Sequence, residues 1–333
     1  MKTMKWLLRR EFWEHKGSFF WTPLVIAAVM LTSVTGTLAY TFFREGGRVG
    51  RIVVNGVEMS KGELFSAAIN AIPQEKRMAI VHALAGGYIY VAAPLFIVMA
   101  ALVFFYCLSA LNDERRDRSI FFWKSLPVSD EMTVLSKVLA AVCVLPVITM
   151  AVATLTGVGM LVLMSIGLGI KGINLAGPLL GSIDFYLAPL RLLALLPVYN
   201  LWALPTVGWL LMVSAWARSK VFLWAVGTPL IALVLVKWLD FMISSAGLTL
   251  YPDWFATNIV LRALGSTVPG GWLAFERVPT HAMMLQETGS IDAGAVFMQS
   301  WMTLTGPSVW IGAIAGAAMI YAAMRLRSQR GEG

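Results

Sequence analysis

The side chains that could perform catalysis or hold a metal ion are few and far apart. The 333-residue chain has three histidines, His15, His82 and His281, and we expect none to have a metal-ligating partner at helical spacing. Its two cysteines, Cys107 and Cys143, lie in apolar runs and form no Cys-x-x-Cys pair. The residues therefore predict no metal site, and the histidines are expected at the surface.

Motifs for nucleotide hydrolysis and for acyl transfer are missing from the sequence. A phosphate-cradling loop needs G-x-x-x-x-G-K-[ST], and the chain has no Gly-Lys dipeptide. It also has no H-E-x-x-H and no G-x-S-x-G motif. We therefore expect a chain that is not an enzyme, binds no cofactor of its own and cannot hydrolyse ATP by itself.

The densest polar feature is the segment 111–137, LNDERRDRSIFFWKSLPVSDEMTVLSK. A mixed charge cluster at 112–118 is followed by the apolar run 120–123. Pro127 breaks the chain, and Ser129 is a good N-cap for a helix whose first turn holds two acidic residues. A plain solvated loop has no need for four apolar residues in a row, so the run predicts contact with a partner surface or with the membrane interface.

The rest of the chain has the composition of a protein dissolved in lipid. Hydrophobic residues make up 58% of the sequence and charged residues 13%, against about 25% charged in soluble domains. Length and absence of charge predict six transmembrane helices, at roughly 19–43, 87–110, 134–168, 187–216, 221–243 and 304–324. The fold class is therefore an all-α integral membrane protein, with one six-helix domain over 19–324 and a tail at 325–333.

The orientation follows from the lysines and arginines. With both termini inside, the cytoplasmic segments 1–18, 111–133, 217–220 and 325–333 hold about 14 of them in about 54 residues, and the outer segments hold about 9 in about 120. The net charge of +8 is therefore assigned to the cytoplasmic loops and not to nucleic acid binding.

The first 18 residues are expected to form an amphipathic helix in the membrane interface. Basic residues share one sector, an apolar line lies beside it, and tryptophans suit the headgroup layer. A flanking cytoplasmic tail is the alternative. The residues assigned to the interface are Trp6, Arg9, Arg10, Trp13 and Lys16.

Two outer loops, about 44–86 and 244–303, are sizeable. In the first, Asn55-Gly56 between two β-type runs predicts a hairpin, and Ser60 opens a capping box for a helix that should stop near Pro73. These elements predict a small extracytoplasmic cap. The second loop has no clear pattern.

Three weaker features lie in the spans. Gly312 and Gly316 form a small-residue packing face, used either within the subunit or for dimerisation. Two charged pairs, Asp184 with Arg191 and Lys237 with Asp240, lie near outer helix ends. Such pairs are functional candidates at membrane depth, or plain interfacial salt bridges.

Within 111–137 the chain resembles the permeases of type-two ABC exporters. The matching residues are Glu114, Arg118-Ser119, Ile120–Trp123, Pro127-Val128-Ser129 and Lys137, and the first 18 residues resemble the family's elbow helix. The resemblance implies a coupling helix that docks on an ATPase. It assigns the coupling role to Asp113, Glu114, Arg115, Arg116, Asp117, Arg118, Phe121, Phe122, Trp123, Pro127 and Ser129.

The same resemblance implies partners and a location. Two ATPase subunits, which bind ATP and Mg, would work with two permease copies, identical or different, in the bacterial inner membrane. A membrane anchor that moves nothing is one alternative. A secondary transporter is another, although it needs charges at mid-membrane, which the predicted spans lack.

Overall fold

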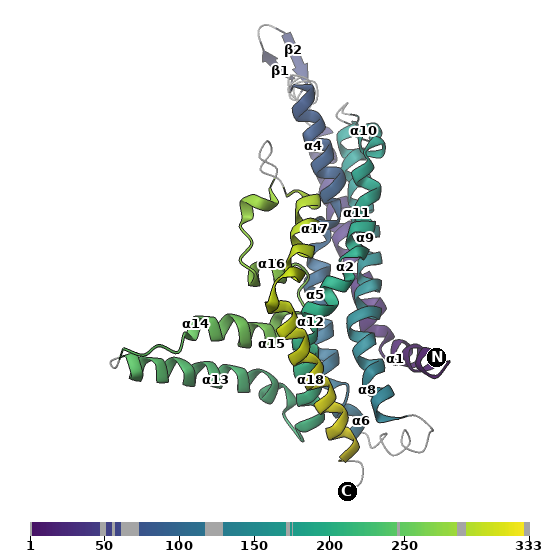
Figure 1. Ribbon diagram of the computed structural model, residues 1–333. Helices are drawn as coiled ribbons and strands as arrows, with labels where there is room; N and C mark the ends of the chain where they lie inside the picture. The colour runs from purple at the N-terminus through teal and green to yellow at the C-terminus, as the bar shows by residue number, and fades with distance from the viewer. Residues whose placement is uncertain are drawn as a thin grey trace.

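The computed structural model describes residues 2–46, 51–54, 57–60, 73–116, 129–170, 174, 176–244, 247–284 and 291–329, and nearly all of them are helical (Figure 1). The helices, in chain order, are α1 (Lys2–Glu14), α2 (Thr22–Gly46), α4 (Gln74–Gly87), α5 (Ala93–Ser109), α6 (Asn112–Arg116), α8 (Asp130–Leu139), α9 (Leu145–Ile170), α10 (Ala176–Gly181), α11 (Ile183–Ala194), α12 (Leu196–Trp216), α13 (Val221–Ser244), α14 (Pro252–Phe255), α15 (Arg262–Gly265), α16 (Gly271–Phe275), α17 (Ala293–Met302) and α18 (Pro307–Gln329).

Within the described residues, six helical stretches are long and apolar enough to cross a membrane, as predicted. They are Gly17–Arg44, Met78–Arg116, Asp130–Ile170, Ile183–Trp216, Val221–Ser244 and Pro307–Gln329. Helices satisfy their backbone hydrogen bonds internally, which lipid requires of a spanning segment. The chain is therefore an all-α multi-pass membrane protein. The short helix α17 and the 3-10 turn Thr303–Thr305 directly precede the last of these stretches.

The predicted hairpin is confirmed in its strands. Strand β1 (Arg51–Val54) pairs antiparallel with β2 (Val57–Ser60), and Val54 opposes Val57 across a two-residue connection. The connecting residues 55–56 and the helix expected up to Pro73 lie outside the described residues, apart from Pro73 itself. The hairpin lies at one end of the molecule, and both chain termini lie toward the other end, which we call the base (Figure 1).

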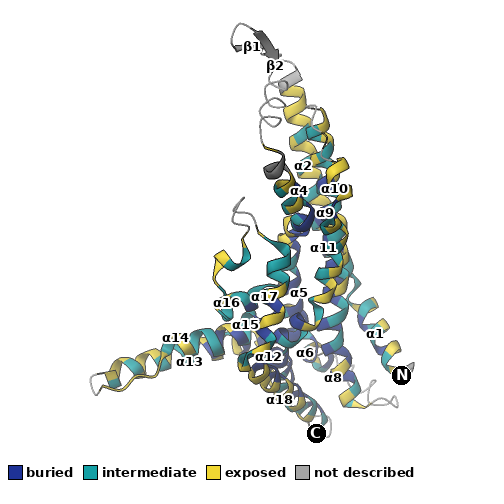
Figure 2. Cartoon of the chain, turned by 45° about the horizontal axis from the view of Figure 1, so that its top comes forward, coloured by how far each residue is buried: buried dark blue, intermediate teal, exposed yellow. Residues whose placement is uncertain are grey.

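The core is centred on α12, whose Tyr199 and Trp202 are fully buried. Figure 2 shows buried residues concentrated where α5, α12 and α18 meet. Helices α12 and α18 pack backbone to backbone, because an added Cβ on Gly316 would lie 2.5 Å from the carbonyl carbon of Leu204. Gly208 of α12 faces the Gly316 backbone in the same contact. The small-residue face of α18 is therefore in use within the chain.

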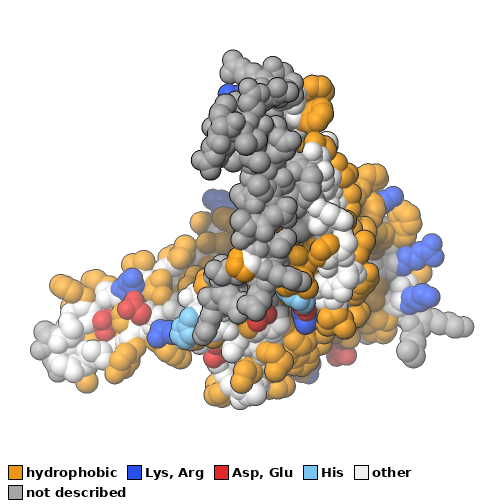
Figure 3. Space-filling view, turned by 90° about the horizontal axis from the view of Figure 1, so that it is seen from above, with side chains coloured by type: hydrophobic (Ala, Val, Ile, Leu, Met, Phe, Trp, Pro, Cys, Tyr) orange, Lys and Arg blue, Asp and Glu red, His pale blue; other side chains and the backbone are white. Residues whose placement is uncertain are grey.

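Helix α13 departs from the direction of the other long helices. It has the length and composition of a span, but it leaves the bundle sideways, and α14 with the π-helical turn Ala256–Leu261 returns beside it (Figure 1). The preceding Lys220 has a φ of 52°, so the backbone turns sharply where α13 begins. Seen along the bundle, apolar side chains cover much of this lateral arm (Figure 3).

Candidate functional site

Helix α6 lies at the base of the bundle and is held against the end of α12. The Arg115 guanidinium donates hydrogen bonds to the carbonyl oxygens of Ser214, of Ala215 at 2.8 Å and of Ala217 at 2.9 Å. The last carbonyls of a helix lack intrahelical partners, and the helix dipole favours a cation there. Arg115 is therefore committed within the chain, which differs from the surface role that the family resemblance implies for it.

Glu114, the neighbour of Arg115, is buried among cations. Its Oε1 lies 3.0 Å from Lys137 Nζ on α8 and 3.4 Å from Arg10 Nη2 on α1, and its Oε2 accepts from Arg327 Nη1 on α18. Arg327 also reaches Asp130 at the start of α8, with 2.9 Å between Nε and Oδ1. Glu114 thus joins α6 to α8 and also to α1 and α18, which are far from it in sequence.

A second carboxylate, Glu11 of α1, completes this arrangement and is fully buried. Its Oε1 lies 3.0 Å from Lys137 Nζ and 3.0 Å from Arg10 Nη2. Its Oε2 accepts a 2.8 Å hydrogen bond from the Tyr106 hydroxyl of α5. Sequence reasoning missed Glu11, because the basic residues of 1–18 were taken as the informative ones. The signal that would have found it is its place on the apolar face of the helix, three residues after Leu8 and seven after Met4.

These side chains form what we call the buried ion cluster: Arg10, Glu11, Glu114, Asp130, Lys137 and Arg327. Its three carboxylates equal its three cations in number, and the half-exposed Glu14 also pairs with Arg10, at 3.1 Å. Removing one member of a buried ion pair typically costs about 3–5 kcal/mol, because the remaining charge stays uncompensated. The cluster therefore fastens α1, α6, α8 and α18 to one another at the base.

Helix α8 begins as the sequence predicts. Ser129 is its N-cap, and the Ser129 hydroxyl accepts a 3.2 Å hydrogen bond from the Met132 amide. This cap sets Asp130 in the first turn, where it meets Arg327. Residues 117–128 lie between α6 and Ser129 and are outside the described residues.

The predicted coupling residues therefore divide into those with a structural contact, those that are exposed and those outside the described residues. Glu114 and Arg115 hold the base together, and Ser129 caps α8. Asp113 and Arg116 are exposed on α6. The others lie outside the described residues: Asp117, Arg118, Phe121, Phe122, Trp123 and Pro127.

A basic hollow of about 530 Å³ opens beside α6. It is lined by Asn112, Arg115, Arg116, Arg218, Ser219 and Lys220, so four cations surround it. The last three residues belong to the turn between α12 and α13. The hollow is thus adjacent to the point where residues 117–128 leave α6, and its charge suits an acidic surface.

The α1 residues assigned to the membrane interface differ in exposure. Trp6 and Trp13 are about half exposed, Arg9 is exposed, and Lys16 lies over the Trp13 ring at 4.9 Å. Arg10 was expected at the membrane interface, and its guanidinium instead enters the buried ion cluster. The reason is geometric, because at 100° per residue Arg10 projects 100° away from the exposed Arg9, on a side of α1 where its Nη2 reaches Glu114 at 3.4 Å.

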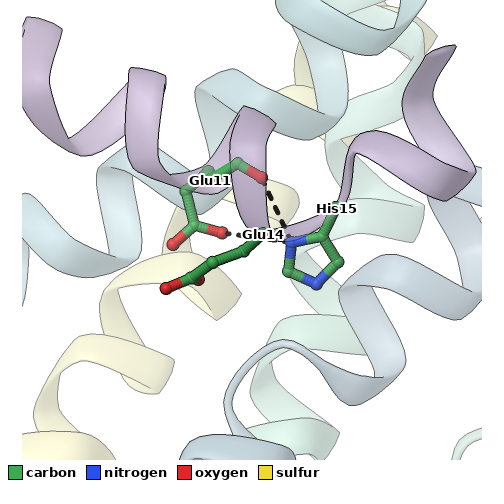
Figure 4. Close-up of side chains that lie close together, drawn as sticks. All are labelled: Glu11, Glu14 and His15. Carbon is green, nitrogen blue, oxygen red and sulfur yellow. Dashed lines mark hydrogen bonds and ion pairs between the residues drawn. The ribbon is translucent and has the colours of Figure 1, made fainter.

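One group on α1 has the composition of a metal site. Glu11, Glu14 and His15 lie close together (Figure 4), so the expectation that His15 has no ligand partner at helical spacing was wrong. The Glu11 oxygens are already engaged by Lys137, Arg10 and the Tyr106 hydroxyl. His15 Nδ1 lies 3.2 Å from the Glu11 carbonyl oxygen and is placed to donate to it. These contacts favour a structural role over metal binding.

The two charged pairs behave differently. Asp184 Oδ1 forms an ion pair with Arg191 Nη1 at 3.0 Å, and Asp184 Oδ2 lies 3.2 Å from Nδ1 of the half-exposed His82. Asp240 accepts a 2.7 Å hydrogen bond from the Leu250 amide, and no ion pair joins it to Lys237 in the described structure.

No family model, curated protein or solved structure matches this chain. The resemblance to type-two ABC exporter permeases therefore depends on the residues named above.

Proposed function

We propose that this chain is the membrane subunit of an ATP-driven exporter and that its base receives movement from a separate ATPase. The observation that carries the proposal is the buried ion cluster. Residues 117–128 connect α6, which carries Glu114, to Ser129, which caps α8. A force on this segment is therefore applied to both α6 and α8, and the ion pair between Glu114 of α6 and Lys137 of α8 links the two helices.

The cluster is suited to spreading such a force over the bundle. Its ion pairs connect α6 and α8 to α1 through Glu11 and to α18 through Arg327. Arg115 connects the same base to the end of α12. Separating a buried ion pair leaves each charge uncompensated, which is costly, so these helix ends are expected to move together.

Docking itself is assigned to the aromatic run and the basic hollow. Exposed ion pairs contribute about 0–1 kcal/mol each, whereas buried aromatic anchors contribute about 2 kcal/mol or more. Phe121, Phe122 and Trp123 would therefore hold the ATPase, and the cations around the hollow would orient an acidic face of it. ATP and Mg would bind to the ATPase, because the sequence has no phosphate-binding loop. A second permease copy would complete the pathway.

The test is co-purification with a phosphate-loop ATPase of the same organism, sought first in the reading frames next to the gene for this chain. Phe122→Ala with Trp123→Ala should release the ATPase. The matched control is Phe42→Ala with Phe43→Ala, an exposed aromatic pair at the far end of α2. Unchanged complex in the docking variant would refute the docking assignment.

A second variant separates transmission from docking. Glu114→Gln should keep the ATPase bound but lower substrate-dependent ATP turnover, since it weakens the link between α6, α8 and α18. ATPase binding without any effect of the substrate, in the unmodified chain, would favour a membrane anchor. Specific ATP turnover by the isolated chain would refute the proposal outright.

A further inference from the structure

An apolar cavity of about 370 Å³ lies where the lateral arm joins the bundle. Its walls come from α12, α13, α18 and the returning segment 255–263, with Trp209, Pro229, Phe255, Ile259, Ile311 and Met319 among them. The volume lies near the lower end of the range of small-molecule sites, about 300–1,000 Å³.

One charged side chain, Arg262 of α15, contributes to this wall. Arg262 is 6% exposed, and its Nη1 donates one 3.0 Å hydrogen bond, to the Ser308 hydroxyl. Its Nε and Nη2 are buried without a hydrogen-bond partner. The guanidinium carbon lies 4.6 Å from the centre of the Trp202 ring, a cation–π contact that leaves those donors unused.

No carboxylate in the described structure forms an ion pair with Arg262. Glu276 acts electrostatically on its charge, but no ion pair joins the two side chains among the described residues. A buried cation without a hydrogen-bonded counter-ion is costly, and ionisable groups among membrane helices are functional candidates. The cavity wall therefore presents a positive charge that the chain does not neutralise directly.

The surroundings hold Arg262 in this position. Its carbonyl oxygen accepts from the Thr206 hydroxyl of α12 at 2.7 Å and from the Ser266 hydroxyl at 2.9 Å. The Ser266 amide donates to the same Thr206 hydroxyl at 3.0 Å. On α18, a side chain at Gly312 would collide with the guanidinium, since an added Cβ would lie 2.6 Å from Nη2. Helix α12 thus fixes the backbone of Arg262, and α18 makes room for its guanidinium.

We propose that this cavity binds an acidic amphiphile, with its carboxylate or phosphate on Arg262 and its hydrocarbon chain among the apolar side chains. The guanidinium fork pairs with two oxygens of such a headgroup. The hydrogen bond to Ser308 and the cation–π contact with Trp202 are the interactions that have to yield for the fork to turn toward the cavity. The cavity has room for one chain. This binding site does not depend on the proposed coupling to an ATPase.

Binding is measured on the purified chain in nanodiscs of zwitterionic lipid, at a pH where both acidic probes are ionised. Dodecanoate and dodecyl phosphate test the two headgroups, dodecanol supplies the same chain without charge, and inorganic phosphate supplies charge without a chain. At least one acidic probe should bind about tenfold or more tightly than dodecanol, because hydrogen bonds to charged groups are the strong ones. The preferred acid identifies the headgroup.

Arg262→Met should reduce binding of the preferred acid by about tenfold or more. Arg325→Met is the matched control, since this exposed arginine lies over Tyr321, away from the cavity. Ala315→Phe is an independent test at an exposed position of the cavity wall, where the larger side chain should block entry of the hydrocarbon chain of the ligand. The proposal is overturned by equal binding of the acids and dodecanol, by equally tight inorganic phosphate, or by unchanged binding in Ala315→Phe.

Discussion

Lys137 is the residue on which the buried ion cluster most directly depends. Its Nζ lies 3.0 Å from Oε1 of both Glu11 and Glu114, and its side chain is 2% exposed. Lys137→Met keeps most of the apolar stem and removes the charge between two carboxylates. The general cost of breaking a buried pair is about 3–5 kcal/mol. Because Arg10 still contacts both carboxylates, we expect a value near the lower limit, about 3 kcal/mol.

The assay is equilibrium unfolding in detergent micelles, with a double variant as the internal check. Glu11→Gln added to Lys137→Met removes one of the uncompensated charges and should recover about 1–2 kcal/mol of the loss. Arg325→Met, an exposed change on α18, should stay within about 0.5 kcal/mol of the unmodified protein. A loss below about 1 kcal/mol for Lys137→Met, or a double variant less stable than the single one, would refute the cluster as a structural element.

Three further predictions concern packing, capping and topology. Gly316→Ala should lower the free energy of unfolding by about 1–3 kcal/mol, because its Cβ would meet the backbone of α12. Gly169→Ala, with open space around it, should be neutral or stabilising. Equal effects of the two substitutions would contradict the close contact. Ser129→Ala should cost about 1 kcal/mol in the same unfolding assay through loss of the α8 cap, and no loss would argue against that cap. A single cysteine at Asn55 should react with an impermeant label from outside and one at Gln329 from inside, and the opposite pattern would reverse the topology.

Sequence reasoning predicted the helices well because their signals are local. Length and absence of charge set the six spans, and the Ser129 cap needs only the next three residues. The β-hairpin was predictable for the same reason, since only two residues separate its strands and Asn55-Gly56 is a hairpin signal.

The buried ion cluster was not predictable, because its partners are distant in the chain. Arg327 and Glu114 are separated by 213 residues, and Lys137 and Glu11 by 126. The sequence marks Glu114 and Lys137 through the family resemblance but does not say that they touch. Arg262 was missed because it lies in the loop 244–303, where no periodic pattern was recognised. The lateral course of α13 depends on the turn at Lys220, which the composition of α13 cannot reveal.

The ion pair between Glu114 and Arg327 also has a consequence for biosynthesis. Glu114 enters the membrane domain at the end of the second span, and Arg327 arrives with the last described helix. Until α18 is inserted, both Glu114 and Asp130 lack a cation that they have in the finished protein. Glu114 keeps Lys137 and Arg10 at that stage, whereas Asp130 lacks the ion-pair partner that it has among the described residues, so the base is completed only when the last described helix joins it.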